Sequence, residues 1–389
     1  DHRDLHSFPT RRSSDLVKGN VVVGQSGGPT SVINSSLVGV FKAAKDAGVE
    51  KIYGMRNGIE GFLNKKVVDM SEYVKNELDI ELLKRTPSSF LGTCRFKLPS
   101  VEESEATYKL LFSIMEELDI KYFFYIGGND SMDTIKKLSN YAEEIGSDIR
   151  FMGVPKTIDN DLAVTDHTPG YGSAAKYIAS ALKEIIRDVN TYPTESVTVV
   201  EIMGRNAGWL TAAAALSRAE DCPGPDLIYL PEVTFDYDRF LEQVKAVKKK
   251  KTSVVIAVSE GIKLANGEYV CEDNKQATFE DSFGHKSLGG TALYLADFIG
   301  ANLGVKSRGI VFSTLQRCAS HIVSRRDITE AFMAGSEAVQ AALNGETGKM
   351  IIFTRTSNEP YNIICSTYDV NKIANIEKVV PDEIGRAHV

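Results

Sequence analysis

At 389 residues the chain is too long for one compact core and fits two domains of ordinary size. Its composition, 43% hydrophobic and 25% charged, is that of a globular protein, and no apolar run approaches the roughly 20 residues that a membrane-spanning helix needs. The formal net charge of -7 argues against a general nucleic-acid surface, so we predict neither nucleic acid nor membrane among its partners.

Both ends of the sequence read as foreign. Residues 1–16 show no hydrophobic periodicity and lack the apolar stretch of a secretory signal, and they resemble translated sequencing-adapter read-through. The alternative for residues 1–16 is a transit or disordered tail, which the arginines and serines of this stretch permit. The final residues, 385–389, also resemble adapter sequence. We therefore predict a non-native tail at each end.

From residue 17 onward, short apolar runs alternate with longer helical patterns. Apolar runs predict strands at residues 20–28, 121–130, 149–161 (running into a loop), 196–204, 227–232, 253–261 and 308–317. Helical spacing of apolar residues predicts helices at 31–48, 131–146 and 172–189. Strand followed by helix, repeated, is typical of a parallel sheet with helices on both faces. The predicted fold class is α/β, with two three-layer domains, mainly parallel sheets and an active site in the cleft between them.

Nearly every predicted strand ends in glycine or in a charged residue. In open parallel sheets, ligands bind at the carboxyl ends of the strands. This rule places the following residues on one rim: Gly27, Gly28, Gly127, Gly128, Lys156, Asp159, Arg205, Glu260 and Arg317. A glycine pair after a strand also occurs in tight turns, so by itself it is weak evidence for a ligand site. The residues around it decide whether it indicates one.

Those surrounding residues carry a family resemblance. The segments are "GQSGGPTSVINSSL", "LGTCRF", "IGGNDSMDT", "PKTIDND", "TDHTPGYGSAAKY", "VVEIMGRNAGWL" and "VSEG". In their order and spacing they resemble the phosphofructokinase family over nearly all of residues 17–345, and "TIDND" together with "MGR" is highly specific. The resemblance implies transfer of a phosphoryl group to the 1-hydroxyl of fructose 6-phosphate, assisted by Mg²⁺.

The resemblance also implies which part of the chain binds which substrate. We predict a donor-binding domain at residues 17–160, a mainly sugar-phosphate-binding domain at 161–345, and a C-terminal segment at 346–384 that returns toward the first domain. A homo-oligomer, dimer or tetramer, is expected by family analogy. The cysteines have no zinc-type spacing, which indicates reduced thiols in a cytoplasmic protein; they are Cys94, Cys222, Cys271, Cys318 and Cys365.

Phosphoryl transfer to a sugar hydroxyl needs a carboxylate that receives the hydroxyl proton. Asp159 in "TIDND" matches the family's base, and a free aspartate, with a pKa of about 3.9, is ionised at pH 7 unless it is strongly buried. We predict Asp159 and Lys156 as the catalytic pair. The alternative is that the "DND" triplet merely caps the next helix.

The remaining site residues follow from the motifs that they match. For the sugar we predict Thr157, Asp161, Met203, Gly204, Arg205, Glu260, Arg317 and Arg326, with Arg325 as the alternative to Arg326. For the donor we predict Gly27, Gly28, Arg95, Gly128, Asp130 and Ser131, and for the metal Asn129 and Asp130. Asn129 stands where the family usually has an aspartate, and a neutral amide is a weaker ligand for a hard cation.

Two departures from the family pattern bear on function. Ser196 occupies the place of an arginine that ATP-using bacterial relatives lend to a neighbouring subunit's sugar phosphate, so this cross-subunit contact is open. Asp130 and Lys156 occupy positions that are typically glycine in ATP-using members, although lysine also occurs in some of those. Because Asp130 puts a negative charge where the α-phosphate of ATP would lie, we predict pyrophosphate as the donor. The alternatives are an ATP-dependent enzyme and a non-catalytic regulatory subunit.

Overall fold

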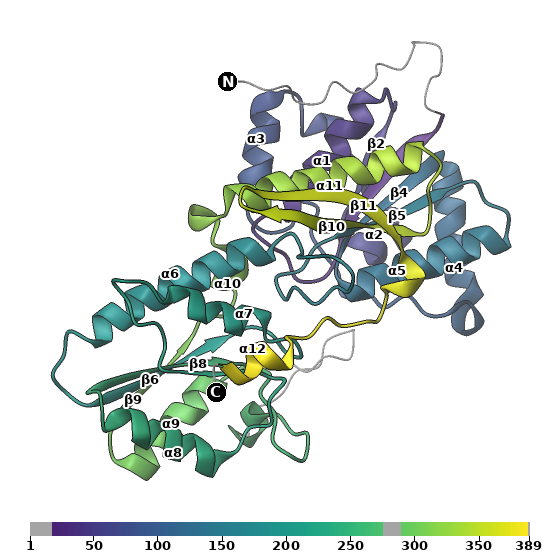
Figure 1. Cartoon of the computed structure of the whole chain (residues 1–389). Coiled ribbons are helices and arrows are strands. Elements are labelled where there is room, and N and C mark those ends of the chain that lie inside the picture. The colour runs from purple at the N-terminus through teal and green to yellow at the C-terminus, as the bar shows by residue number, and fades with distance from the viewer. Residues whose placement is uncertain (1–17, 275–288, 388–389) are drawn as a thin grey trace.

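The computed structural model describes residues 18–274 and 289–387 (Figure 1). The tail predicted at residues 1–16 lies outside them, as do residues 388–389 of the tail predicted at the other end. Within the described chain, two α/β bodies are each built on one sheet of mainly parallel strands. The predicted fold class is thereby confirmed.

The first sheet has seven strands and is parallel except at its two edges. In spatial order the strands are β11 (Tyr361–Asp369), β10 (Lys349–Asn358), β5 (Arg150–Pro155), β4 (Ile120–Gly127), β1 (Asn20–Gln25), β2 (Ile52–Met55) and β3 (Val67–Asp69). The pairs β2–β3 and β10–β11 are antiparallel. Strand β1 is a nearly continuous buried run, "NVVVGQ", as expected for a strand covered on both faces.

Helices cover both faces of this sheet. One face packs against α1 (Ile33–Asp46), α3 (Glu77–Arg85) and α11 (Arg325–Leu343). The other packs against α2 (Gly58–Leu63), α4 (Val101–Glu117) and α5 (Asn129–Glu144). The two apolar cores on either side of the sheet make this body three layers deep.

The second sheet has four strands, all parallel. Their order is β7 (Leu227–Tyr229), β8 (Ser253–Ser259), β6 (Ser196–Ile202) and β9 (Lys306–Val311). On one face lie α6 (Tyr171–Val189) and α7 (Trp209–Ala212), and on the other lie α8 (Tyr237–Lys248) and α9 (Thr291–Leu303). The short helix α10 (Leu315–Cys318) follows β9, and α12 (Asp382–Ala387) closes the described chain.

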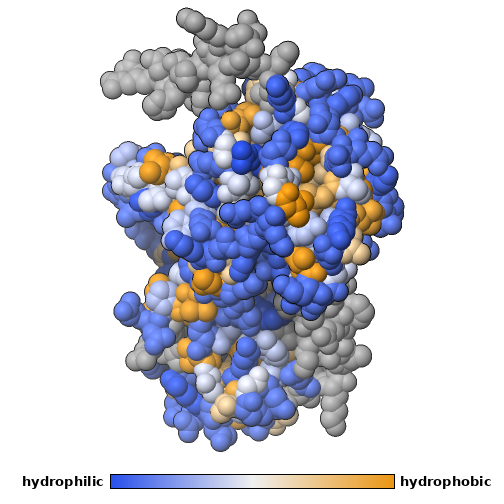
Figure 2. Space-filling model, turned by 90° about the vertical axis from the view of Figure 1, so that its right-hand side faces the viewer, coloured by the Kyte–Doolittle hydropathy of each residue, from blue (hydrophilic) through white to orange (hydrophobic). Residues whose placement is uncertain are grey.

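Short 3-10 turns complete the structure: η1 (Met70–Glu72), η2 (Ala213–Ser217), η3 (Val270–Asn274), η4 (Ser320–Ile322) and η5 (Val370–Lys372). Figure 2 shows that the two bodies meet at a waist where hydrophilic residues gather on the face in view. Among the described residues, no helix combines the length and the apolar character that crossing a membrane requires. The predicted domain boundaries at residues 160, 345 and 384 stay predictions, although β10, β11 and α11 all pack in the first body.

Helix α11 reaches the first body through a very close contact with α1 (Figure 1). A Cβ atom added at Gly39 would lie 2.2 Å from the carbonyl oxygen of Phe332, and one added at Gly335 would lie 2.1 Å from that of Ser36. The two helix backbones therefore touch where each carries a glycine.

Replacing Gly335 with alanine should lower the free energy of unfolding by about 1–3 kcal/mol, the usual cost of overpacking, which exceeds the gain in helix propensity of about 0.5–1 kcal/mol. The measurement is the urea midpoint of the variant. Thr329→Ala on the exposed side of the same helix is the control and should change stability by less than about 0.5 kcal/mol. A midpoint that stays constant or rises in Gly335→Ala would contradict the close contact.

Candidate active site

A cavity of about 570 Å³ lies between the two bodies, at the carboxyl ends of their strands. Strands β1, β4 and β5 of the first body and β6 and β8 of the second end at its wall. The predicted site residues that line it are Gly27, Gly28, Arg95, Gly128, Asn129, Asp130, Ser131, Lys156, Thr157, Asp159, Asp161, Met203, Arg205, Glu260 and Arg317. The residues that the rule for parallel strands placed on one rim therefore lie around one cavity, with the exception of Gly127.

Three residues that the sequence placed at the site or on its rim do not line the cavity: Gly127, the last residue of β4, Gly204 and Arg326. Gly204 lies just behind the wall, where its backbone N–H donates to Glu260 Oε1 at 3.4 Å. Arg326 is exposed near the start of α11, and its guanidinium lies 4.3 Å from the centre of the Tyr361 ring. Its neighbour Arg325 is exposed as well. Within this chain, motif matching alone put Arg326 at the sugar site.

Sequence reasoning missed residues from the C-terminal segment. Asn375 and Glu377 line the cavity, and Asn206, next to the predicted Arg205, donates to Glu377 Oε1 at 3.1 Å. The stretch "NIEK" around Glu377 carries no motif and no strand or helix pattern. Glu377 lies here because residues 373–380 cross from the first body to the second, and no local pattern in the sequence indicates this crossing.

The first wall of the cavity combines a helix N-terminus with a buried lysine. Helix α5 begins at Asn129, with Asp130 in its first turn, and the N–H groups of a helix's first turn carry the partial positive charge that attracts phosphate. Lys156, at the end of β5, is 2% exposed and donates from Nζ to the carbonyl oxygen of Gly28 at 2.7 Å. Burial lowers the pKa of Lys156 to about 8, although the negative charge of Asp159 acts in the opposite direction.

The loop after β5 carries the two aspartates into the cavity. Thr157 N–H donates to the carbonyl oxygen of Pro169, and Thr168 Oγ1 donates back to that of Thr157, which closes the loop on itself. Asp159 N–H donates to Thr157 Oγ1 at 3.1 Å. The next helix, α6, has Gly170 at its N-cap, so the alternative in which the aspartates cap that helix is wrong.

Burial is the main influence on the cavity's carboxyl groups. It raises the pKa of Asp159, while the positive charges of Lys156, Arg205 and Arg317 oppose the rise. It also raises the pKa of Asp161 to about 7, with a further contribution from the charge of Asp159. Glu260 rises to a pKa of about 8 for the same two reasons. Asp161 and Glu260 therefore titrate near neutral pH, and the pKa of Asp159 also lies above that of a free aspartate.

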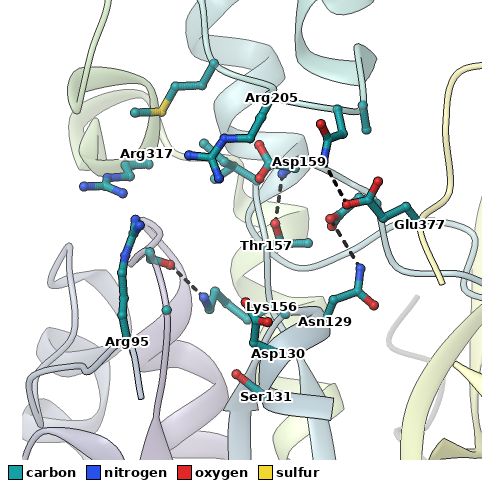
Figure 3. A pocket seen from close by; sticks show the side chains of 18 of the residues that line it. Arg95, Asn129, Asp130, Ser131, Lys156, Thr157, Asp159, Arg205, Arg317 and Glu377 are labelled. Atoms are coloured by element: carbon teal, nitrogen blue, oxygen red, sulfur yellow. Dashed lines mark hydrogen bonds between the residues drawn. The ribbon is translucent and has the colours of Figure 1, made fainter. Parts of the chain in front are cut away.

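Three arginines from distant parts of the chain converge on the same space. Figure 3 shows Arg95 and Arg317 approaching each other from opposite sides, with Arg205 close to Asp159. Burial lowers the pKa of Arg95, and the positive charges of Arg317 and Arg205 lower it further. Such mutual repulsion is relieved when an anion with several oxygens binds between the guanidinium groups, for which phosphate is well suited.

The cavity thus joins cations that can hold phosphate groups to carboxylates that can exchange a proton near neutral pH. These are the requirements of an enzyme that transfers a phosphoryl group to a hydroxyl. Comparison with known proteins leads to the same class. The phosphofructokinase family model matches residues 20–342.

Relatives match over almost the whole chain. A pyrophosphate–fructose 6-phosphate 1-phosphotransferase of Halomonas elongata is 38% identical over 375 residues, which cover 95% of this chain and 88% of that protein. Another, from Xanthomonas campestris pv. campestris, is 41% identical over 368 residues, with coverages of 94% and 87%. The crystal structure of a pyrophosphate-dependent phosphofructokinase from Nitrosospira multiformis matches with a TM-score of 0.83 and 35% identity, covering 94% of this chain and 86% of that one. The chain belongs to the phosphofructokinase family.

Proposed function

We propose that this protein is an enzyme that transfers a phosphoryl group between pyrophosphate and the 1-hydroxyl of fructose 6-phosphate, giving fructose 1,6-bisphosphate and phosphate reversibly. The observation that carries the donor assignment is the pair of charged residues beside the glycine turn, Asp130 in the first turn of α5 and Lys156 bonded to Gly28. The names of the relatives at 38% and 41% identity support both substrates.

The residues of the cavity divide into three groups in this proposal. Asp159 is the base and Lys156 the cation that offsets the charge of the transferred group. The donor lies against α5 and the glycine turn, in contact with Gly27, Gly28, Arg95, Gly128, Asp130 and Ser131. The sugar lies across the cleft, against Thr157, Asp161, Met203, Arg205, Glu260 and Arg317, with Gly204 shaping the turn behind them.

The direction of proton transfer follows from the state of Asp159. Ionised, the carboxylate accepts the proton of the 1-hydroxyl as the oxygen attacks phosphorus. Protonated, it returns that proton to the leaving oxygen in the reverse reaction. Because burial raises the pKa of Asp159, its protonated form is more accessible than that of a free aspartate, which suits a reaction that runs both ways. Lys156 and the arginines hold the phosphate charge in place throughout.

The donor set fits Mg²⁺ when the metal is shared with the phosphates. In the described part of the chain, no three carboxylate, histidine or cysteine side chains are grouped so that they could hold a metal alone. Mg²⁺ commonly takes one or two protein ligands and completes its shell with substrate phosphates and water. The buried oxygens Asn129 Oδ1 and Asp161 Oδ1 lack a hydrogen-bond partner among the described residues and are therefore available as acceptors. We assign the metal to Asn129 and Asp130; when bound, it neutralises developing charge on the phosphates.

A coupled assay for fructose 1,6-bisphosphate tests the proposed function directly. Purified protein without residues 1–16 should form the product from fructose 6-phosphate, Mg²⁺ and pyrophosphate. Product with ATP alone would favour the ATP-dependent alternative. The absence of product with every donor would favour the regulatory subunit.

Arg317 provides a separate test of the sugar site. Replacing Arg317 with alanine should raise the sugar KM by roughly 10–100-fold and lower kcat much less, because a remote phosphate clamp binds ground state and transition state alike. Arg239→Ala, an exposed arginine on α8, is the control and should leave both constants unchanged. An unchanged KM would remove Arg317 from the site. The same measurement on Arg326→Ala decides whether that arginine takes any part.

Assembly and location complete the proposal. We infer a homo-oligomer, dimer or tetramer, in which Ser196 does not supply the cross-subunit arginine contact. All five cysteines are free thiols, and Cys94, Cys222 and Cys271 are buried. Free, packed thiols support a reducing compartment, so the cytoplasm is the location we infer.

A further inference from the structure

The C-terminal strap, residues 373–380, fastens the two bodies to each other. At its start, Ile373 and Ala374 are buried in the core of the first body, among side chains of α4 and α5. At its end, Val380 is buried in the core of the second body, among side chains of α6 and α7. Figure 1 shows this segment crossing from the side of α5 to α12 beside the second sheet. Both anchors are apolar, so neither end is a loose tail.

Between its anchors the strap holds the loop that carries the aspartates. Glu377 pairs with Leu162 in an isolated antiparallel bridge, and the backbone N–H of Lys378 donates to the carbonyl oxygen of Asp161 at 2.7 Å. The loop residue Asp161 is therefore fixed by backbone contacts from a segment more than two hundred positions further along the chain. Glu377 itself lines the cavity on the other side of this contact (Figure 3).

The side chain of Lys378 reaches further into the same loop. Its Nζ donates to the carbonyl oxygens of Thr165 and Asp166, both at 3.0 Å, and to Asn160 Oδ1 at 3.4 Å. An ammonium group has three N–H donors, so these acceptors take all of them. Burial lowers the pKa of Lys378 to about 8, while the charges of Asp166 and Asp161 act in the opposite direction. The Lys378 side chain is therefore held in place by its three hydrogen-bond acceptors and is not free in solvent.

The strap is tied to the second body at the same residue. Trp209 Nε1 donates to the carbonyl oxygen of Lys378 at 2.7 Å, and Lys378 Nζ lies 5.5 Å from the centre of the Trp209 ring. Two residues later, the N–H of Val380 donates to Glu232 Oε1, which also accepts from Gly208 N–H. Trp209 and Gly208 follow directly after the turn that carries Arg205, so Lys378 touches both the aspartate loop and the arginine turn.

We propose that Lys378 is a positioning residue, which holds the loop of Asp159 and Asp161 at a fixed place relative to the sugar-binding groups of the second body. The proposal rests on the proposed function insofar as Asp159 is the base. The base comes from the first body's β5, whereas Arg205 and Glu260 come from the second sheet. Their relative placement therefore depends on contacts that span the cleft, and Lys378 makes such contacts on both sides.

Removing Lys378 should leave the loop attached to the first body. Phe353 N–H donates to Thr165 Oγ1 and Asp166 N–H donates to Phe353 O, both at 2.9 Å, so the loop stays joined to β10. What is lost is the hold of the strap's side chain on the loop, at Asn160, Thr165 and Asp166, together with the contact of Nζ with the Trp209 ring; the backbone bonds of residue 378 stay. A displacement of about 1 Å between reacting groups costs on the order of 10²-fold in rate, so we expect kcat of Lys378→Met to fall by roughly 10–100-fold. The KM for pyrophosphate should change little, because the donor lies on the first body.

The experiment combines kinetics with amide hydrogen exchange on the full chain. In Lys378→Met, kcat should fall as stated and the amides of residues 159–166 should exchange faster than in the unmodified protein. Trp209 is the only tryptophan in the sequence, so its fluorescence reports on the strap, and collisional quenching by acrylamide should increase. The control is Lys372→Met, an exposed lysine in the preceding turn, which should change none of these readouts.

Several outcomes would overturn the proposal. A kcat within about twofold of the unmodified protein, or a lower kcat with unchanged exchange of residues 159–166, excludes positioning through the loop. If Lys378→Met does not fold, Trp209→Phe decides, because it removes the N–H donor to the backbone carbonyl of Lys378 and keeps an aromatic ring at this position. It should lower kcat and speed exchange of the same amides, and no change in either would overturn the proposal. If the unmodified protein shows no turnover with pyrophosphate, the proposed function fails, while the exchange data still test whether Lys378 orders the loop.

Discussion

Replacing Asp159 with serine should lower kcat by roughly 10²–10⁴-fold, the usual contribution of a general base, with little change in the sugar KM. The carboxylate is the acceptor for the 1-hydroxyl proton, and serine leaves no base of comparable strength in its place. The sugar's binding groups, Arg205, Glu260 and Arg317, stay in the cavity. Steady-state kinetics in the forward direction measures both constants.

The pH dependence gives the same residue a second signature. In the forward direction the base must be ionised, so activity should fall as pH drops through the pKa of Asp159. Burial raises that pKa, and thus the acid limb should lie above the pH of about 4 expected for a free aspartate. In the reverse direction the protonated form is needed, and activity should fall as pH rises through the same pKa. Asp159→Ser should lose this limb in both directions.

The control for Asp159 is an aspartate outside the cavity. Asp148 is exposed and paired with Lys121 at 2.7 Å, so Asp148→Ser should keep full activity. Because the folded state raises the pKa of Asp159, its ionised form destabilises the protein above that pKa, and serine should not lower the free energy of unfolding at pH 7. Turnover within tenfold of the unmodified protein would show that Asp159 is not the base.

The sequence predicted the walls of the cavity because they obey a local rule. Strands β1, β4, β5, β6 and β8 are each followed within two residues by glycine or by a charged residue, and parallel strands bring such ends to one edge. Their predicted and observed starts agree closely; the strand predicted at residues 196–204, for example, runs from Ser196 to Ile202. A short apolar run bounded by glycine is therefore enough to place most of the residues that line the cavity.

Contacts between distant segments could not be predicted in this way. The strand β10 has a buried start and an exposed end, so neither alternation nor a continuous apolar run marks it clearly. Glu377 reaches the cavity, and Lys378 the loop beside it, because Ile373 and Val380 insert into different cores, which no local pattern reveals. Arg326 shows the opposite problem, since it matches a motif while its guanidinium lies on Tyr361. The raised pKa of Asp159 likewise depends on burial that the sequence does not display.

The choice of donor is the second large effect that the site predicts. Asp130 lies in the first turn of α5 and lines the same cavity as Gly27 and Gly28, which we predict to contact the phosphates of the donor. A carboxylate about 4 Å from a phosphate charge costs on the order of 4 kcal/mol at an effective dielectric near 20. This is roughly a thousandfold in affinity, before any steric overlap with the side chain is counted.

Pyrophosphate escapes most of this cost. It has no α-phosphate or nucleoside to meet Asp130, and in the proposed site Lys156 and Arg95 offset its charge. Asp130 would there serve as a ligand for Mg²⁺, whose charge would further reduce the repulsion. At one fixed Mg²⁺ concentration, kcat/KM with pyrophosphate should therefore exceed that with ATP by at least about a hundredfold. Parallel assays with the two donors on the same preparation measure the ratio.

Two variants of Asp130 separate its charge from its size. Asp130→Gly removes both and should raise kcat/KM with ATP by roughly 10–100-fold while lowering that with pyrophosphate, because a proposed metal ligand is lost as well. Asp130→Asn keeps the volume and removes only the charge, so any part of the selectivity that survives in it is steric. Since Lys156 stays in place in both variants, neither should change the sugar KM. If the unmodified protein prefers ATP, the donor assignment is wrong even though the sugar chemistry stands. If Asp130→Gly leaves the ratio of kcat/KM for the two donors unchanged, the selectivity comes from Lys156 and the other predicted donor-binding residues.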